Sequence, residues 1–188
     1  MAYGFRPVQM AGSRYQTGGF VKVPIEDDLI ATAIYNGGPV AYTIAATTAA
    51  TGLSANDTPL DDDLSCGILV GATWENSAGE QKWGNYYDAT GVAGKSFAFI
   101  VPLDDVVFQI QGNAAWDRKY IGFECLTTGT TGSTITGNSN ISLLQVTSDA
   151  TKAVVIPIGV LENGNEDSST PDVLVRFAAA GIQTKPLF

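Results

Sequence analysis

DVVFQIQ, residues 105–111, alternates apolar and polar side chains in the way that is typical of a β-strand. In an extended chain, Val106, Phe108 and Ile110 point to one side, and the residues between them point to the other. The first side is wholly apolar and the second is mostly polar. The pattern predicts a strand with one buried face.

Similar short runs recur along the chain between clusters of Gly, Asn, Asp, Ser and Pro. Helical signal is poor, because no stretch keeps apolar positions at helical spacing for three turns. The sequence therefore predicts an all-β fold, an antiparallel β-sandwich or barrel. The expected strands are 20–25, 30–35, 39–45, 67–75, 81–87, 96–101, 105–111, 120–126, 141–146, 153–161 and 172–177.

The chain divides into an extended N-terminal arm, residues 1–19, and a single β-rich domain, residues 20–188. Two long loops are expected at 46–65 and 127–140, because both stretches consist mainly of small and polar residues. A chain of 188 residues buries enough surface to fold without a metal or a disulfide. The only cysteines, Cys66 and Cys125, are far apart in sequence, and buried free thiols are favoured over one disulfide.

The charge and the absence of histidine exclude several classes of function. Ten basic and nineteen acidic residues give a net charge of −9, and only Arg118 and Lys119 are adjacent basic residues. Binding to phosphates needs clustered Lys and Arg, so we expect no nucleic-acid partner. The absence of histidine excludes Ser–His and Cys–His nucleophile pairs. We also expect no membrane partner and no signal peptide, because no apolar run has the required length or flanks.

Two acidic clusters invite a metal-binding interpretation that their spacing does not support. Three consecutive side chains, Asp61–Asp63, cannot easily converge on one ion, and a solvated turn is favoured. Asn163, Asn165 and Asp167 match the start of a calcium loop, but the glycine and glutamate that such a loop requires are missing. We expect neither a metal nor a cofactor.

Aromatic and acidic residues gather between positions 74 and 88, namely Trp74, Trp83 and Tyr87 with Glu75, Glu80 and Asp88. Aromatic residues beside carboxylates are what a glycan-binding cleft or a glycosidase needs. The favoured interpretation is a β-hairpin with a turn at Asn76–Gly79, whose tryptophans pack on the core or across the strands.

The arm, AYGFRPVQMAGSRYQTGG at residues 2–19, has neither helical nor strand periodicity. Its apolar groups must pack on another chain or on the protein's own domain, and both alternatives remain open here. Pro7 restricts Arg6 to extended conformations, which lowers the entropy lost on docking. Aromatic and arginine side chains often dominate interface energies. The expected partner contacts are Tyr3, Phe5, Arg6, Pro7, Val8, Met10, Arg14 and Tyr15.

The order of several fragments resembles a family of small virion proteins of tailed bacteriophages, the capsid decoration or cement proteins. The fragments are AYGFRPV (2–8), ATAIYNGGPV (31–40), GILVGATWENSAGEQKWGNYY (67–87), AFIVPLDDVVFQIQ (98–111), TGSTITGNSNISL (131–143) and PDVLVRF (171–177). The resemblance runs through most of the chain. It departs at Tyr86–Tyr87, where the family often has Tyr–Trp, and after the last fragment.

The resemblance implies a structural protein, made in the host cytoplasm and bound as a homotrimer to the outside of an icosahedral head. There it would bind between subunits of the major capsid protein and stabilise the shell, without enzymatic activity. Two other hypotheses stay open. One is a tail or fibre component that binds a host glycan through Trp74, Trp83 and Tyr87; the other is a hydrolase that uses Glu75 and Glu80.

Overall fold

The computed structural model describes residues 2–10, 19–25, 33–44, 51–55, 67–103, 105–129, 132–145, 155–161 and 170–178; for Met10, 41–44 and 51–55 it describes the backbone alone. Within these residues every pairing between named strands is antiparallel. Their helical content is a single 3₁₀ turn, η2 (Arg118–Tyr120). The predicted all-β antiparallel fold is confirmed.

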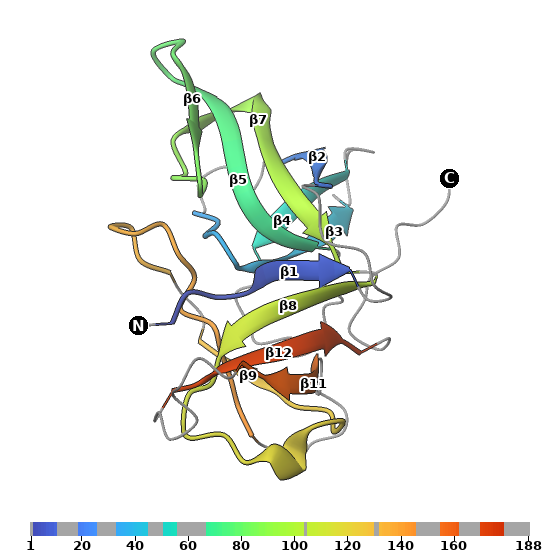
Figure 1. The fold of residues 1–188 in the computed structure, drawn as a ribbon. Helices are drawn as coiled ribbons and strands as arrows, with labels where there is room; N and C mark the ends of the chain where they lie inside the picture. The colour runs from blue at the N-terminus through green and yellow to red at the C-terminus, as the bar shows by residue number, and fades with distance from the viewer. Residues whose placement is uncertain are drawn as a thin grey trace.

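Four strands form one sheet in the order β1–β8–β12–β11, which crosses the lower half of the molecule in Figure 1. They are β1 (Arg6–Met10), β8 (Val106–Gln111), β12 (Asp172–Phe177) and β11 (Val155–Val160). The N-terminal strand therefore lies beside a strand from the middle of the chain. A small separate pair consists of β9 (Thr127–Thr128) and β10 (Ser142–Leu143).

Six strands form the second sheet, in the order β2–β7–β5–β3–β4 with β6 paired to β5. They are β2 (Val21–Pro24), β7 (Gly91–Pro102), β5 (Gly67–Asn76), β3 (Pro39–Ile44), β4 (Thr51–Ala55) and β6 (Gln81–Gly84). β5 and β7 are its longest strands, and both bend strongly along their length (Figure 1).

The bend has a local cause. The register between β5 and β7 shifts at Leu69/Gly71 and again at Trp74/Asn76, and such bulges bend a strand and increase its twist. The sheet consequently curls into a half-barrel, and its edge strand β2 approaches β4 at the other edge. The architecture is thus a half-barrel packed on a second sheet.

The hydrophobic core has two parts that meet at β5. One part lies between β5, β7 and the four-stranded sheet, and includes Ile68; the other fills the half-barrel and includes Leu69. The first contains Phe5, Ile68, Val101, Leu103, Val106, Phe108, Ile110, Trp116, Cys125, Ile141, Leu143, Val155, Val173, Val175 and Phe177. The second contains Val23, Ile25, Ile34, Val40, Leu69, Ala72, Trp74, Tyr87, Ala98 and Ile100.

The alternation in DVVFQIQ is confirmed with one departure. Val106, Phe108 and Ile110 are at most 3% exposed, whereas Gln109 and Gln111 are partly exposed. Val107 is also buried, at 2% exposure. Strand β8 is an interior strand of its sheet, with β1 and β12 as its hydrogen-bonded neighbours.

Most expected strands contain an observed strand, and four predictions need correction. One is the expected loop 127–140, whose first two residues form β9. Range 30–35 contributes an isolated bridge between Ile34 and Tyr87, with residues 30–32 outside the described part. The expected loop 46–65 contains β4, which pairs with β3. The expected strand 120–126 is wrong, because η2 precedes an exposed, irregular stretch in which only Cys125 forms a bridge.

Candidate binding surfaces

Residues 2–10 of the expected arm are part of the domain, and residues 11–18 lie outside the described part of the chain. Strand β1 pairs with β8, and Phe5, just before it, is only 1% exposed. The Phe5 ring centroid lies 6.0 Å from that of Phe108 and 5.0 Å from that of Phe177. The expectation that Phe5 anchors a partner chain is therefore wrong, because its ring already fills the protein's own core.

Tyr3 is held by the same sheet. Its hydroxyl donates a 2.5 Å hydrogen bond to Asp172 Oδ1, and Gln109 Nε2 donates to both the Tyr3 hydroxyl and Asp172 Oδ2 at 3.0 and 2.7 Å. The Arg6 guanidinium carbon lies 3.8 Å from the centroid of the Tyr3 ring. Burial and the bond to Asp172 raise the pKa of Tyr3 above its ordinary value. Tyr3 and Arg6 thus make contacts within their own chain.

The remaining arm residues divide into two groups. Pro7 and Val8 lie on edge strand β1, and Val8 is 39% exposed. The side chain of Met10, together with Arg14 and Tyr15, lies outside the described residues. A partner-binding role for these five residues stays a prediction.

The predicted hairpin between Trp74 and Trp83 is confirmed. β5 and β6 pair across the turn, where Gly79 N–H donates to Asn76 O at 2.9 Å. Trp74 lies opposite Lys82 and Trp83 lies opposite Thr73 in this pairing. Because side chains alternate along a strand, Trp74 faces the core and Trp83 faces outward.

Two of the three aromatic residues expected to bind a glycan are core residues. Trp74 is 4% exposed and Tyr87 is 0% exposed, and their rings pack edge to face with centroids 5.6 Å apart. Trp74 Nε1 also donates to Thr90 Oγ1 at 3.0 Å. The glycan-binding expectation is wrong for Trp74 and Tyr87, because neither offers an open ring face. Trp83 differs, since 85% of its surface is exposed.

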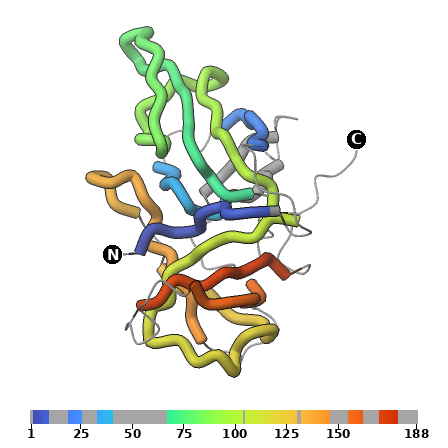
Figure 2. The backbone as a smooth tube through the Cα atoms, in the orientation of Figure 1, coloured from blue at the N-terminus to red at the C-terminus, as the bar shows by residue number. Residues whose placement is uncertain are grey.

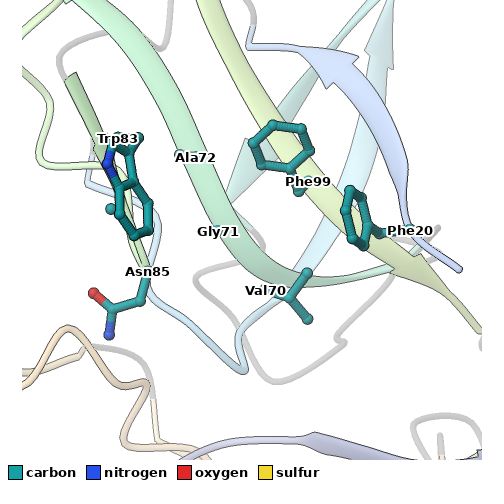
Figure 3. A pocket seen from close by; sticks show the side chains of 8 residues that line it. Phe20, Val70, Gly71, Ala72, Trp83, Asn85 and Phe99 are labelled. Atoms are coloured by element: carbon teal, nitrogen blue, oxygen red, sulfur yellow. The ribbon is translucent and has the colours of Figure 1, made fainter. Parts of the chain in front are cut away.

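Trp83 belongs to an open groove of about 230 Å³ on the outer side of the half-barrel (Figure 3). Figure 3 shows Trp83 on one side of β5 and Phe99 and Phe20 on the other. Phe20 is 55% exposed and packs edge to face on Phe99 at 5.4 Å. We call this site the aromatic groove. Its lining consists of Phe20, Val70, Gly71, Ala72, Trp83, Gly84, Asn85 and Phe99.

The floor of the groove is backbone at two positions. Gly71 and Gly84 carry no side chain, and a Cβ on Gly71 would lie 3.2 Å from Gly84 O. Asn85 brings a polar group, and its Nδ2 donates to Thr136 O at 3.1 Å. Among the residues that the structure describes, those lining the groove carry no charge. Its chemistry therefore suits an apolar side chain better than a polar ligand.

The segment 132–139 next to the groove is firmly held. Gly137 N–H donates to Ser133 O at 2.6 Å, and Ser139 N–H donates to Asn36 O at 2.8 Å. Figure 2 shows this loop, in orange, standing out from the body of the protein below the β5–β6 hairpin. Its tip carries Ile135, which is 95% exposed. The loop thus presents a large apolar side chain on an ordered backbone.

A second apolar surface lies at the other end of the molecule, around η2 and β11. Ile121 is 38% exposed, Phe123 is 59% exposed and Ile158 is 41% exposed. Gly122 N–H donates to Pro157 O at 2.8 Å, which places the stretch 121–123 beside β11. We call these three residues the η2–β11 patch.

Basic residues border the η2–β11 patch. Arg118 and Lys119 form η2 with Tyr120, and Ile121 follows η2 directly. Lys119 Nζ lies 2.8 Å from Asp117 Oδ2, which raises the pKa of Lys119 and lowers that of Asp117. The adjacent basic pair of this acidic chain thus lies next to exposed apolar side chains.

The carboxylates considered for hydrolysis bind neighbouring side chains at the hairpin. Glu75 accepts hydrogen bonds from Lys95 Nζ at 2.5 Å and from Gln81 Nε2 at 3.0 Å. Glu80 Oε2 accepts from Asn76 Nδ2 at 2.8 Å. Neither carboxylate lines the aromatic groove.

Several other sequence predictions concern thiols, metals and membranes. Cys125 is a free, buried thiol, and burial raises its pKa to about 11. The other cysteine and the two acidic clusters lie outside the described residues, namely Cys66, Asp61–Asp63 and 163–167. In the described part of the chain, no group of three or more metal-ligating side chains gathers. No helix in that part is long and apolar enough to cross a membrane.

The residues of both surfaces were missed by reasoning from the sequence, apart from Trp83. Phe20, Phe99 and Val70 lie in apolar runs that indicate strands, and nothing in those runs marks an outward-facing side chain. Ile135 stands alone among Thr, Gly, Ser and Asn, and that isolation was the one available signal. Comparison with protein-family models, curated proteins and solved structures finds no match for this chain.

Proposed function

We propose that this protein is a capsid decoration protein of a tailed bacteriophage. It binds the outer surface of the head between subunits of the major capsid protein, as a homotrimer, and stabilises the shell by adhesion rather than by catalysis. The proposal starts from the order of sequence fragments that resembles this family. The geometry adds a surface through which such adhesion can act.

The observation that carries the proposal is the η2–β11 patch. It places three exposed apolar side chains beside Arg118 and Lys119 on a chain whose net charge is −9. Aromatic and arginine side chains are the residues that most often dominate binding energy. The charge elsewhere on the chain disfavours nonspecific association. We assign this patch to the head because three exposed apolar side chains gather there beside Arg118 and Lys119.

The arm has a smaller role in this proposal than the sequence suggested. Tyr3, Phe5 and Arg6 make contacts within the chain, so they anchor the N-terminus to the protein's own sheet. Val8 and Pro7 remain at the surface, and residues 11–18 follow them in sequence. In this proposal the η2–β11 patch is the main contact with the head, and Pro7, Val8, Met10, Arg14 and Tyr15 stay expected partner contacts.

The test is binding of purified protein to heads that lack it. We expect saturable binding of the wild-type protein, seen as density on the outside of the shell. Phe123→Ala should weaken binding about tenfold or more, because truncation of an interface aromatic commonly costs that much. Val21→Ala is the control, because it removes an exposed apolar side chain of β2 that belongs to neither surface, and its effect on binding should be small.

Two results would contradict the proposal. One is absence of wild-type binding to heads; the other is density inside the shell or on the tail. Equal binding by wild type and Phe123→Ala would leave a head protein but remove the η2–β11 patch from its interface.

A further inference from the structure

We propose that the aromatic groove of one copy receives Ile135 of a second copy of this chain. We call Ile135, at the tip of segment 132–139, the knob. The knob and the aromatic groove lie on one surface of the protein. The distribution of charge favours a second copy of the chain as the partner of both. This inference rests on the proposed function in one respect, because it names a contact through which the proposed homotrimer can form, and it is tested separately from binding to heads.

The knob is rigid. The carbonyls on both sides of Ile135 accept hydrogen bonds from the β6–β7 connection, Thr134 O from the Tyr86 hydroxyl at 3.3 Å and Thr136 O from Asn85 Nδ2 at 3.1 Å. The Tyr86 ring stacks on Tyr35, with centroids 5.7 Å apart and planes 7° from parallel. The tip is therefore ordered before binding, and little backbone entropy is lost when its side chain docks.

The groove is suited to one such side chain. Its volume of about 230 Å³ is smaller than the roughly 300–1,000 Å³ of ordinary small-molecule pockets. Trp83, Phe99 and Phe20 form its sides and Gly71 leaves its floor open, so a branched aliphatic side chain can contact rings and backbone together (Figure 3). Ile135 does not fill the groove of its own chain, because it is 95% exposed.

The charges favour a second copy as the occupant. Two chains of net charge −9 repel each other over most of their surfaces. Residues 125–148, which include the knob, contain no charged side chain, and none of the described residues that line the groove is charged. This surface is therefore one where two acidic copies can approach without bringing like charges together.

The two parts of the contact are neighbours. Asn85 lines the groove and also binds Thr136, the residue after Ile135. Each copy thus presents a knob and a groove side by side. Such a surface pairs reciprocally across a twofold axis or repeats around a ring, and either arrangement buries both features in every copy.

Trp83 itself reports on the contact. Trp83 is 85% exposed, whereas Trp74 and Trp116 are 4% and 9% exposed. Burial of Trp83 by a second copy should shift the tryptophan emission of the protein to shorter wavelength as its concentration rises. Sedimentation equilibrium of the same samples gives the mass of the assembly.

We expect the wild-type protein to exceed the mass of one chain and to show this blue shift. Ile135→Ala should weaken association about tenfold or more and abolish the concentration-dependent shift, although Trp83 is still present. Trp83→Ala should weaken association to a similar extent. Phe123→Ala, which removes an exposed aromatic at the other end, should associate as the wild type does.

The inference is overturned if the wild-type protein remains a single chain at all concentrations. It is equally overturned if the assembly is indifferent to both Ile135→Ala and Trp83→Ala. Thermal unfolding of each variant checks that the fold is intact, which an exposed site allows. Failure to bind heads leaves this result untouched, because association is measured with purified protein alone.

Discussion

At the scale of single residues, Gly37 connects two parts of the fold through its backbone. Its N–H donates to Leu69 O and its carbonyl accepts from Phe5 N–H, both at 2.8 Å. It therefore joins the N-terminal segment to β5, where the two core parts meet. Its φ of +76° is in the left-handed region, and a Cβ there would lie 2.7 Å from Tyr3 O. Both the conformation and the close approach require glycine at this position.

The first prediction compares Gly37→Ala with Gly79→Ala. Gly79 has a similar φ of +80°, but nothing lies within 4 Å of its missing Cβ. Both variants pay about 1–2 kcal/mol for the left-handed conformation, and Gly37→Ala should lose about 1–3 kcal/mol more through overpacking. Urea unfolding measures the difference. Equal losses of stability in the two variants would show that the N-terminal segment moves away from residue 37 at little cost.

At the scale of elements, the fate of the arm depends on strand pairing. The apolar residues of AYGFRPVQM show no strand periodicity, yet residues 6–10 pair with β8. The register shifts between Pro7 and Gln9, and this irregularity disturbs the alternation that a sequence pattern would reveal. An irregular strand can be recognised only once its partner is known.

The second prediction tests whether β1 is an integral strand. Phe5→Ala should destabilise the protein by about 3–5 kcal/mol, the usual cost of deleting a buried aromatic ring. Val8→Ala, on the same segment but exposed, should change stability by less than about 0.5 kcal/mol. Chemical unfolding at neutral pH measures both. A small loss in Phe5→Ala would mean that the segment detaches readily, as a free arm would.

The two proposed surfaces likewise arise from elements that the sequence did not mark. Tyr120–Leu126 is apolar enough to predict a strand, but η2 begins at Arg118 and leaves Ile121 and Phe123 in solvent. Segment 132–139 lies in the expected loop 127–140, and hydrogen bonds to the β6–β7 connection hold it in place. Departures from local pattern often fall at functional sites.

At the scale of the whole molecule, net charge and exposed apolar surfaces have opposite effects on association between copies. A charge of −9 keeps copies apart, and the uncharged groove and Ile135 offer them one place to meet. The free energy of association is then the favourable free energy of burying apolar surface, reduced by the electrostatic repulsion between copies. Salt changes the second quantity and has little effect on the first.

The third prediction follows from this balance. Raising the salt concentration from about 0.05 to 0.3 M should strengthen association, because the Debye length falls from roughly 14 to 6 Å and repulsion between copies is screened. Sedimentation at several protein concentrations measures the change. Ile135→Ala should show little association at any salt. Weakening by salt would instead point to ion pairs at the contact.

The sequence by itself determined the fold class, the hairpin at Asn76–Gly79 and the buried face of DVVFQIQ. These follow from alternation and turn chemistry, which are local properties of neighbouring residues. Only the tertiary structure decided that Phe5 is a core residue, that Trp74 and Tyr87 are closed to ligands, and that Trp83, Phe20 and Phe99 share one groove. The reason is physical: alternation says that a strand has two faces, but which face meets water depends on the elements that pack against it.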